Sequence, residues 1–262
     1  MNNYFYSDYR HAAYYDDIYD AIVDDLDFWK SVVSRLGDEC LELACGTGRV
    51  SFFLHRNGIK VTGIDFSEDM LQIFDRKKES LGIERNHYPK ASLGDMRCFN
   101  LGRKFRSIII PSNSLNHIEE NNDLIATFRC ISDHLEPEGL LAFDILNPGF
   151  EFFMRDPASV YDQQIIERHT SSGYFETWEM SRHVKAEQMS YVKYYFRPCR
   201  ADGSPLTETI DETDIKVRFY YPKEIELYLD QCGFEIVSRS DWYDSRPWKG
   251  ETSEQVFIVR KK

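Results

Sequence analysis

Two glycines, Gly46 and Gly48, follow an apolar strand-like segment in "CLELACGTGRV", which covers residues 40–50. Glycine allows a tight turn and lets a ligand approach the backbone closely. The dinucleotide-binding fingerprint requires a third glycine where this chain has Ser51, and a phosphate-binding loop requires a Lys-Ser or Lys-Thr pair that does not follow here. The glycine pair therefore predicts a ligand at this turn and leaves its identity open.

Two aspartates stand at the ends of the next expected strands. Asp65 closes "KVTGID", about 20 residues beyond Gly46, where an acid accepts hydrogen bonds from ribose hydroxyls in nucleoside-binding folds. Asp95, in "GDMR", could accept the exocyclic amine of adenine while Met96 or Leu71 packs on the ring. Asp65 could instead cap the next helix, and Asp95 could be a turn residue. Their places after strands favour the nucleoside interpretation for both.

A polar cluster, "PSNSLNHI" at 111–118, follows three isoleucines that predict a buried strand. Its side chains would lie at the mouth of a cleft, where a reacting group belongs. His117 could exchange a proton there, because histidine titrates near neutral pH. A single histidine is more often a hydrogen-bonded structural residue, so both roles stay open for His117.

Short apolar segments alternate with helical segments of ten or more residues around these motifs. This alternation predicts βαβ units and an α/β fold with a parallel sheet, whose ligands bind outside the carboxyl ends of the strands. Strands are expected at 39–44, 60–65, 106–111 and 140–146, with another ending at 92–95, and helices at 48–58, 67–82 and 121–135.

The flanking segments have different patterns. Residues 161–220 are rich in tyrosine, phenylalanine, tryptophan, valine and threonine, and predict an antiparallel sheet. A helix is expected again at 222–233, and two closing strands follow, joined by too short a link for a parallel crossover. Up to about residue 36 the chain is expected to be helical, with an apolar face of Ile18, Ile22, Val23, Leu26, Phe28 and Trp29.

Composition narrows the class of protein. The net charge of −12 over 262 residues argues against a polyanionic partner, because binding phosphates requires clusters of lysine and arginine. The six cysteines have no paired spacing, so reduced thiols and no metal site are expected. The first residues lack the features of a signal peptide, and no apolar run reaches the roughly 20 residues of a membrane span. We therefore expect a cytoplasmic protein that binds neither nucleic acid nor membrane.

The segments "LELACGTGR", "VTGIDFSEDML", "GDM" and "GLLAFDI", in this order and spacing, resemble the class I S-adenosylmethionine-dependent methyltransferases. The resemblance implies a seven-stranded, mostly parallel Rossmann-like sheet flanked by helices, with an antiparallel last strand. It also implies S-adenosyl-L-methionine as the cofactor. The predicted division is an N-terminal helical lid at 1–36, a core at 37–150 and 221–262, and an inserted antiparallel β subdomain at 151–220 that covers the acceptor site.

The resemblance assigns parts of the cofactor to positions of this chain. The turn after the first strand would line the methionine portion, Asp65 would hold the ribose, Asp95 would contact adenine, and the start of the polar cluster would border the sulfonium. The cofactor-binding residues expected in this way are Tyr19, Glu42, Ala44, Gly46, Gly48, Arg49, Asp65, Phe66, Ser67, Met70, Asp95, Met96, Ser112 and Asn113.

More narrowly, the start "YYDDIY" and the inserted sheet resemble the bacterial small-molecule branch that includes amino-sugar N-methyltransferases. "SLNH" is similar to a Ser-x-Gly-His stretch of those enzymes, which places His117 at their active-site histidine and Asn116 at the glycine. The expected activity is methyl transfer to a nitrogen or oxygen of a small molecule by in-line displacement, with His117 or Tyr15 taking the acceptor's proton.

Three alternatives remain at this stage. The protein could bind S-adenosylmethionine without methyl transfer, or it could methylate a protein or an RNA. A nicotinamide-dependent oxidoreductase is disfavoured by Ser51 and by the lack of a Tyr-x-x-x-Lys pair after the fourth or fifth strand. The identity of the acceptor stays open, and so does a homodimer.

Overall fold

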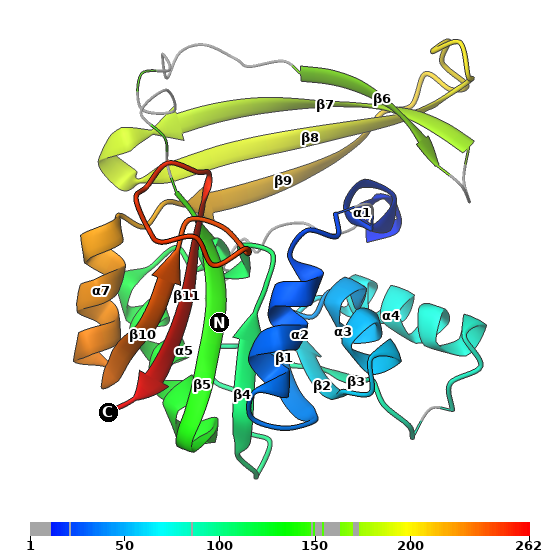
Figure 1. Cartoon of the computed structure of the whole chain (residues 1–262). Coiled ribbons are helices and arrows are strands. Elements are labelled where there is room, and N and C mark those ends of the chain that lie inside the picture. The colour runs from blue at the N-terminus through cyan, green and yellow to red at the C-terminus, as the bar shows by residue number, and fades with distance from the viewer. Residues whose placement is uncertain are drawn as a thin grey trace.

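The computed structural model describes residues 12–20, 22–84, 86–147, 149, 154, 163–169 and 173–262. Within these residues the strands form a seven-stranded sheet of order β10-β11-β5-β4-β1-β2-β3 and a four-stranded sheet of order β6-β7-β8-β9 (Figure 1). The predicted α/β architecture, a large sheet with an inserted antiparallel sheet, is therefore confirmed. No helix among the described residues has the length and apolar character to cross a membrane.

The large sheet is parallel except at one strand. β11 runs antiparallel to both β5 and β10, while β1 pairs in parallel with β2 and β4. The expected antiparallel closing strand is thus β11. The strands of this sheet are β1 (Glu39–Leu43), β2 (Lys60–Asp65), β3 (Lys90–Leu93), β4 (Phe105–Ile110), β5 (Leu135–Leu146), β10 (Phe234–Ser240) and β11 (Glu254–Lys261).

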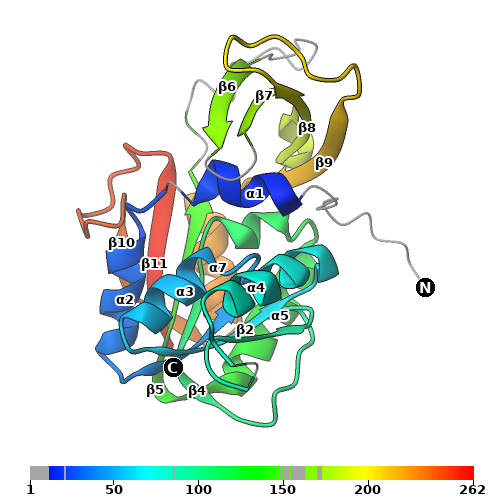
Figure 2. The ribbon, with the colours of Figure 1, turned by 90° about the vertical axis from the view of Figure 1, so that its right-hand side faces the viewer.

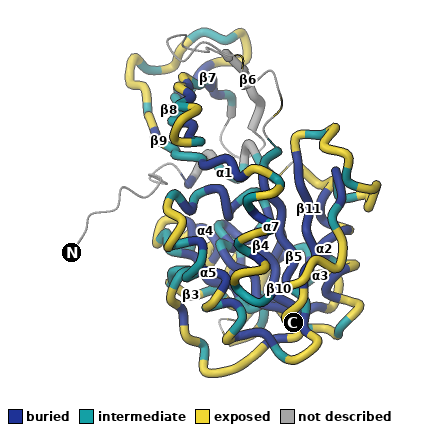
Figure 3. The backbone as a smooth tube through the Cα atoms, turned by 90° about the vertical axis from the view of Figure 1, so that its left-hand side faces the viewer, coloured by how far each residue is buried: buried dark blue, intermediate teal, exposed yellow. Residues whose placement is uncertain are grey.

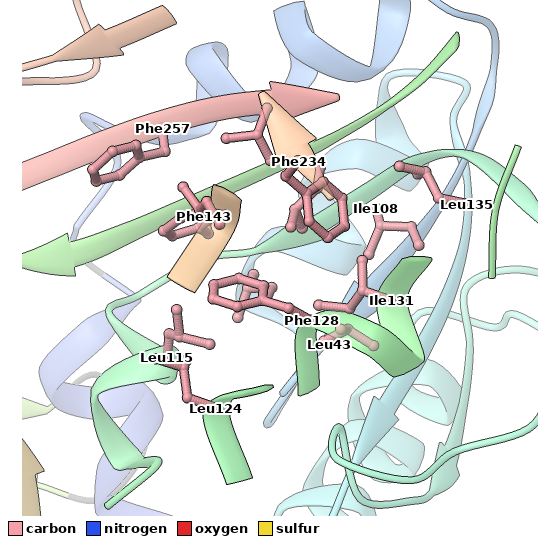
Figure 4. Close-up of a cluster of buried hydrophobic side chains, with 14 of the residues drawn as sticks. Leu43, Ile108, Leu115, Leu124, Phe128, Ile131, Leu135, Phe143, Phe234 and Phe257 are labelled. Carbon is pink, nitrogen blue, oxygen red and sulfur yellow. The ribbon is translucent and has the colours of Figure 1, made fainter. Parts of the chain in front are cut away.

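Helices bury the two faces of the large sheet in two separate clusters. Alternate residues of a strand point to opposite faces, so Ile108 and Ile110 of β4 join one cluster and Ile109 joins the other. The first cluster includes Phe128 of one helix and Phe234 of β10 (Figure 4). The strands in the middle of the core are buried along most of their length (Figure 3). The covering helices are α2 (Leu26–Ser34) and α3 (Arg49–Arg56) on one face, and α5 (Asn121–His134) and α7 (Pro222–Gln231) on the other.

Local signals in the sequence set several helix ends. The Ser67 hydroxyl accepts a hydrogen bond from the backbone N–H of Met70, which caps α4 (Glu68–Ser80) as the sequence predicts. Pro222 opens α7, and Gly233 follows its end with a φ of 79°. These ends direct the chain back into the sheet at the expected points.

The N-terminal segment differs from its prediction. It forms two helices, α1 (Ala12–Tyr19) and α2, rather than one continuous helix. The predicted apolar face is wrong for Ile22 and Val23, which are 46% and 57% exposed between the helices. The break has a tertiary cause: the Asp25 carboxylate binds the Arg49 guanidinium and the indole N–H of Trp29, which fixes where α2 begins.

The inserted sheet lies beyond the carboxyl ends of the parallel strands, and α1 lies between it and the helices α3 and α4 (Figures 1 and 2). All its neighbouring strands pair antiparallel, and β9 forms one edge. The sequence predicted an antiparallel sheet over residues 161–220, and the sheet has four strands among the described residues. The strands are β6 (Gln163–His169), β7 (Gly173–Val184), β8 (Met189–Cys199) and β9 (Asp211–Arg218), with the short helix η3 (Lys185–Glu187) between β7 and β8.

The ion pair between Arg49 and Asp25 gives the first prediction. Both side chains are buried, at 9% and 3% exposure, so replacing Arg49 with methionine leaves the buried Asp25 carboxylate without a compensating positive charge. We expect Arg49→Met to lower the free energy of unfolding by about 3–5 kcal/mol, measured by urea denaturation.

The exposed pair between Lys60 and Asp38 is the matched control, with side chains 54% and 71% exposed. Lys60→Met should change the free energy of unfolding by less than about 1 kcal/mol. Equal effects of the two substitutions would contradict a structural role for the buried pair.

Candidate active site

A pocket opens at the carboxyl ends of β1, β2 and β3, between these strand ends, α1 and the turn after β4. It is lined by nine of the residues that the sequence singled out, which come from five separate segments of the chain. These nine are Tyr15, Ala44, Gly46, Asp65, Phe66, Met70, Asp95, Met96 and His117.

Asp65 joins the turn after β1 to the end of β2. Its carboxylate accepts hydrogen bonds from the backbone N–H of Gly46 at 2.7 Å and of Ser67 at 2.9 Å. Asp65 is 6% exposed, and burial raises its pKa against the opposing effect of these N–H donors. Gly46 has a φ of 53°, so the turn brings its backbone N–H to the carboxylate without a side chain in the way. Asp65 therefore lies in the pocket wall and also holds the glycine turn.

Gly48 has a packing role that the motif alone does not reveal. A Cβ at Gly48 would lie 2.6 Å from the Phe52 ring and 2.7 Å from the Phe74 ring, and its φ is 91°. The two rings are buried and lie 4.8 Å apart, centroid to centroid. Gly48 itself does not line the pocket.

Glu42 lies behind the turn rather than in the pocket lining. It is 1% exposed, and its carboxyl accepts a 2.5 Å hydrogen bond from the Ser51 hydroxyl. Burial raises the pKa of Glu42 to about 8, against the lowering effect of Ser51. Ser51, at the position of the missing third glycine, therefore serves as the donor for a buried carboxyl group.

Arg97 connects two carboxylates in the pocket wall. Its guanidinium donates to Asp95 at 2.6 Å and to Asp123, in the first turn of α5, also at 2.6 Å. All three residues line the pocket. The sequence indicated Asp95 but not the other two. Arg97 stands in the quoted "GDMR", but its pairing with Asp123 joins segments that no local spacing connects.

The turn after β4 is held by a carboxylate that the sequence did not single out. Ser112 and Asn113 have φ values of 63° and 57°, in the left-handed region. Asp144, at the carboxyl end of β5, accepts hydrogen bonds from their backbone N–H groups at 3.2 and 2.8 Å, and from the hydroxyl of Tyr243. Ser112 and Asn113 do not line the pocket, and the Ser112 hydroxyl accepts a hydrogen bond from Arg49.

The short helix η2 (Ser114–His117) follows this turn and carries His117 into the pocket wall. The Nδ1 atom of His117 lies 3.1 Å from the backbone carbonyl oxygen of Lys216 in β9. A carbonyl only accepts hydrogen bonds, so Nδ1 carries the proton and the acceptor lone pair is on Nε2. Burial lowers the pKa of His117, which keeps the ring neutral near pH 7.

Helix α1 brings Tyr15 to the opposite side of the pocket. The rings of Tyr15 and Tyr19 lie 4.5 Å apart, and Tyr19 does not line the pocket. Asp16 holds the helix in place, because its carboxylate accepts from the Thr47 hydroxyl at 2.5 Å and pairs with Lys77 at 2.6 Å. Burial raises the pKa of Tyr15 far above its usual value, so the phenol stays protonated and can donate a hydrogen bond.

Residues 40–139 match the family model described as "Methyltransferase domain". The chain therefore contains a methyltransferase domain. One relative of the methyltransferase is YqeM of Bacillus subtilis (strain 168), whose name gives its methyltransferase activity only provisionally. It is 29% identical over 85% of this chain and 83% of its own length.

Two further proteins are similar to the methyltransferase. The dTDP-3-amino-3,4,6-trideoxy-alpha-D-glucopyranose N,N-dimethyltransferase of Streptomyces venezuelae is 34% identical over 40% of each chain. The crystal structure of an S-adenosylmethionine-dependent methyltransferase from Clostridium acetobutylicum ATCC 824 superposes with a TM-score of 0.76, at 22% identity, over 97% of this chain and 98% of that one. The structural likeness supports the α/β fold of the described residues.

The contact of Gly48 with two rings gives the second prediction. Gly48→Ala should lower the free energy of unfolding by about 2–4 kcal/mol, because left-handed strain and overpacking add up. The measurement is thermal or urea denaturation of the whole protein.

Gly58 is the matched control, since its φ is 83° and a Cβ there would meet nothing within 4 Å. Gly58→Ala should lower the free energy of unfolding by the left-handed backbone strain alone, about 1–2 kcal/mol. A Gly48→Ala variant no less stable than Gly58→Ala would contradict the packing role of Gly48.

Proposed function

We propose that this methyltransferase transfers a methyl group from S-adenosylmethionine to an amine nitrogen of a small molecule. The observation that carries the proposal is His117, which lines the pocket with its Nδ1 proton directed to the Lys216 carbonyl and its acceptor lone pair on Nε2. The printed name of the Streptomyces venezuelae relative describes methyl transfer to a sugar amine, which supports nitrogen over oxygen.

The donor set of the pocket fits the cofactor. Asp65 offers a buried carboxylate for two ribose hydroxyls beside a turn that has no side chain at Gly46. Phe66, Met70 and Met96 offer apolar surface for the adenosine portion. When bound, the cofactor supplies a methyl group on a sulfonium that is already activated. We propose that Asp95, held by Arg97, accepts the adenine amine, and that Ala44 and Gly46 border the methionine portion.

The remaining predicted cofactor residues are proposed to act through the pocket wall. Glu42, Gly48, Arg49, Ser67, Ser112 and Asn113 do not line the pocket, and their contacts shape the turns after β1, β2 and β4. Tyr19 packs on Tyr15.

His117 is the better of the two proposed bases. An amine attacks only as the free base, so a group beside it must receive its proton. His117 is neutral, because burial lowers its pKa, and its Nε2 can accept. The raised pKa of Tyr15 keeps that phenol protonated, so Tyr15 can orient a substrate but cannot take a proton.

The charge of the pocket rim agrees with an amine acceptor. Glu119, Glu120 and Asp123 line the pocket on the side of η2 and α5. Carboxylates in a partly enclosed site raise the local concentration of cations, so the protonated form of an amine is attracted before it loses its proton.

The inserted sheet and α1 complete the proposed arrangement. Parts of the predicted segments 1–36 and 151–220 lie outside the described residues. We propose that strands β6 to β9 cover the acceptor and that α1 covers the cofactor, which together exclude water from the reaction. The cytoplasmic location and a homodimer stay predictions.

Cofactor binding gives the third prediction. Asp65→Ala removes the carboxylate that we place at the ribose and leaves the Gly46 and Ser67 N–H groups without their acceptor. We expect affinity for S-adenosylmethionine to fall at least 100-fold by isothermal titration calorimetry, since hydrogen bonds to a charged group contribute about 1.5–3 kcal/mol each.

Glu119→Gln is the control for Asp65→Ala, because Glu119 lines the acceptor side of the pocket and pairs with Lys216. It should bind the cofactor with nearly unchanged affinity. An Asp65→Ala variant that is folded and binds the cofactor as tightly as the wild type would refute the ribose assignment.

The fourth prediction concerns methyl transfer and its pH dependence. A screen of small amines, amino sugars and phenols with S-adenosylmethionine should give methylated amines. With saturating acceptor, kcat should rise with pH through the pKa of His117, which burial places below the usual value of about 6.5, and should be level above it.

His117→Ala should lower kcat by about 100-fold or more, because general-base catalysis contributes factors of 10² to 10⁴. It should also remove the rise of kcat with pH. Turnover equal to that of the wild type would exclude His117 as the base. Methylation of phenols alone would exclude the amine assignment while the cofactor assignment stands.

A further inference from the structure

The edge of the inserted sheet faces the helix that carries His117. β9 pairs with β8 on one side and has no strand on the other among the described residues. Lys216 and Arg218 are two residues apart in β9, so their backbone carbonyls point in the same direction. Carbonyl groups at such a junction need hydrogen-bond donors, because an unpaired buried carbonyl costs free energy.

Two adjacent side chains of η2 supply these donors. The Asn116 amide donates to the Arg218 carbonyl at 2.6 Å, and His117 Nδ1 donates to the Lys216 carbonyl at 3.1 Å. Asn116 also accepts a 3.0 Å hydrogen bond from the backbone N–H of Leu146, at the end of β5. Asn116 is 1% exposed, and its hydrogen bond to the Arg218 carbonyl is shielded from water.

The hydrogen bond of His117 and the hydrogen bonds of Asn116 have different consequences. The Lys216 carbonyl decides which ring nitrogen of His117 carries the proton, because it can only accept. That carbonyl is in place only while β9 stays in register with η2, and Asn116 ties β9 to the end of the core strand β5. Asn116 does not line the pocket, so any effect on the reaction acts through His117.

We propose that Asn116 is a positioning residue that couples the inserted sheet to the proton-accepting histidine by fixing β9 against η2. The proposal rests on the proposed function in one respect, which is that His117 acts as the base. The coupling itself is a property of the protein without its substrates, so it can be measured without an acceptor.

Asn116→Leu is the principal test, because leucine has nearly the shape of asparagine, adds no charge and makes neither hydrogen bond. The readout is the pair of imidazole ¹⁵N chemical shifts of His117, assigned by their absence in His117→Ala. In the wild type, Nδ1 should give the shift of a protonated ring nitrogen. In Asn116→Leu the proton should move at least partly to Nε2, and kcat should fall about 10- to 100-fold while the affinity for S-adenosylmethionine changes less than twofold.

Gln188→Met is the matched control. The Gln188 amide donates to the Phe219 carbonyl and to the Glu224 carboxylate, both at 2.8 Å, so this variant also loses an amide donor at the sheet junction and adds no charge. It touches neither η2 nor the pocket, so the ¹⁵N shifts of His117 should stay as in the wild type. A change in both variants would indicate general loosening of the junction and would overturn the specific role of Asn116.

A folded Asn116→Leu variant with wild-type ¹⁵N shifts would refute the positioning role. If Asn116→Leu does not fold, Asn116→Ala carries the test, because alanine is smaller than asparagine and makes neither hydrogen bond. The same tautomer change is expected there, and its absence refutes the proposal. A tautomer that depends on Asn116, together with no methylation of any amine, would leave the coupling intact and overturn the proposed function instead.

Discussion

The carboxylate of Asp144 is the constraint on which the geometry of the active site depends. Two consecutive residues of the turn after β4, Ser112 and Asn113, lie in the left-handed region of φ, where a residue other than glycine costs of order 1–3 kcal/mol. Asp144 accepts both of their backbone N–H groups, and the Tyr243 hydroxyl donates to the same carboxylate. Burial raises the pKa of Asp144 to about 6, so it is still mostly ionised at pH 7. The turn leads directly into η2, so the position of His117 follows from this buried anion.

Asp65 is a second buried carboxylate that holds a turn, on the other side of the pocket. Asp65 accepts the N–H groups of Gly46 and Ser67, so it fixes the turn after β1 relative to the end of β2. Parallel strands end at one edge of a sheet, and their turns expose backbone N–H groups there. An acidic side chain at a strand end therefore has two tasks, to hold a neighbouring turn and to accept a ligand hydroxyl, and Asp65 is placed for both.

The sequence predicts the parts of the molecule that depend on local patterns. Strand-helix alternation gives the large sheet, Ser67 and Pro222 mark helix starts, and Asp65, Asp95 and His117 follow from their places after strands. The partners of these residues are not predictable in this way. Asp144 binds Tyr243 99 residues away, and Arg97 binds Asp123 26 residues away. Spacing along the chain carries no information about such contacts. The predicted apolar face is wrong at Ile22 and Val23 for the same reason, a contact between distant segments. The pairing of Asp25 with Arg49, 24 residues away, fixes the start of α2.

Helix α1 and the inserted sheet are attached to the core in different ways. Helix α1 is held by Asp16, which binds Thr47 in the glycine turn and Lys77 in α4, so its contacts lie on the side where Asp65 and Met70 line the pocket. The inserted sheet is held by Asn116 and His117 at β9, on the side of η2. The first attachment combines an ion pair that is about one-fifth exposed, and so contributes little, with the packing of Ala12 against Met70 and Ile73. The second includes the buried hydrogen bond from Asn116 to the Arg218 carbonyl, whose loss leaves polar groups unpaired. The two attachments therefore differ in kind: α1 is held on the side of α4 by a partly exposed ion pair together with apolar contacts, whereas β9 is held at η2 by hydrogen bonds to its backbone carbonyls.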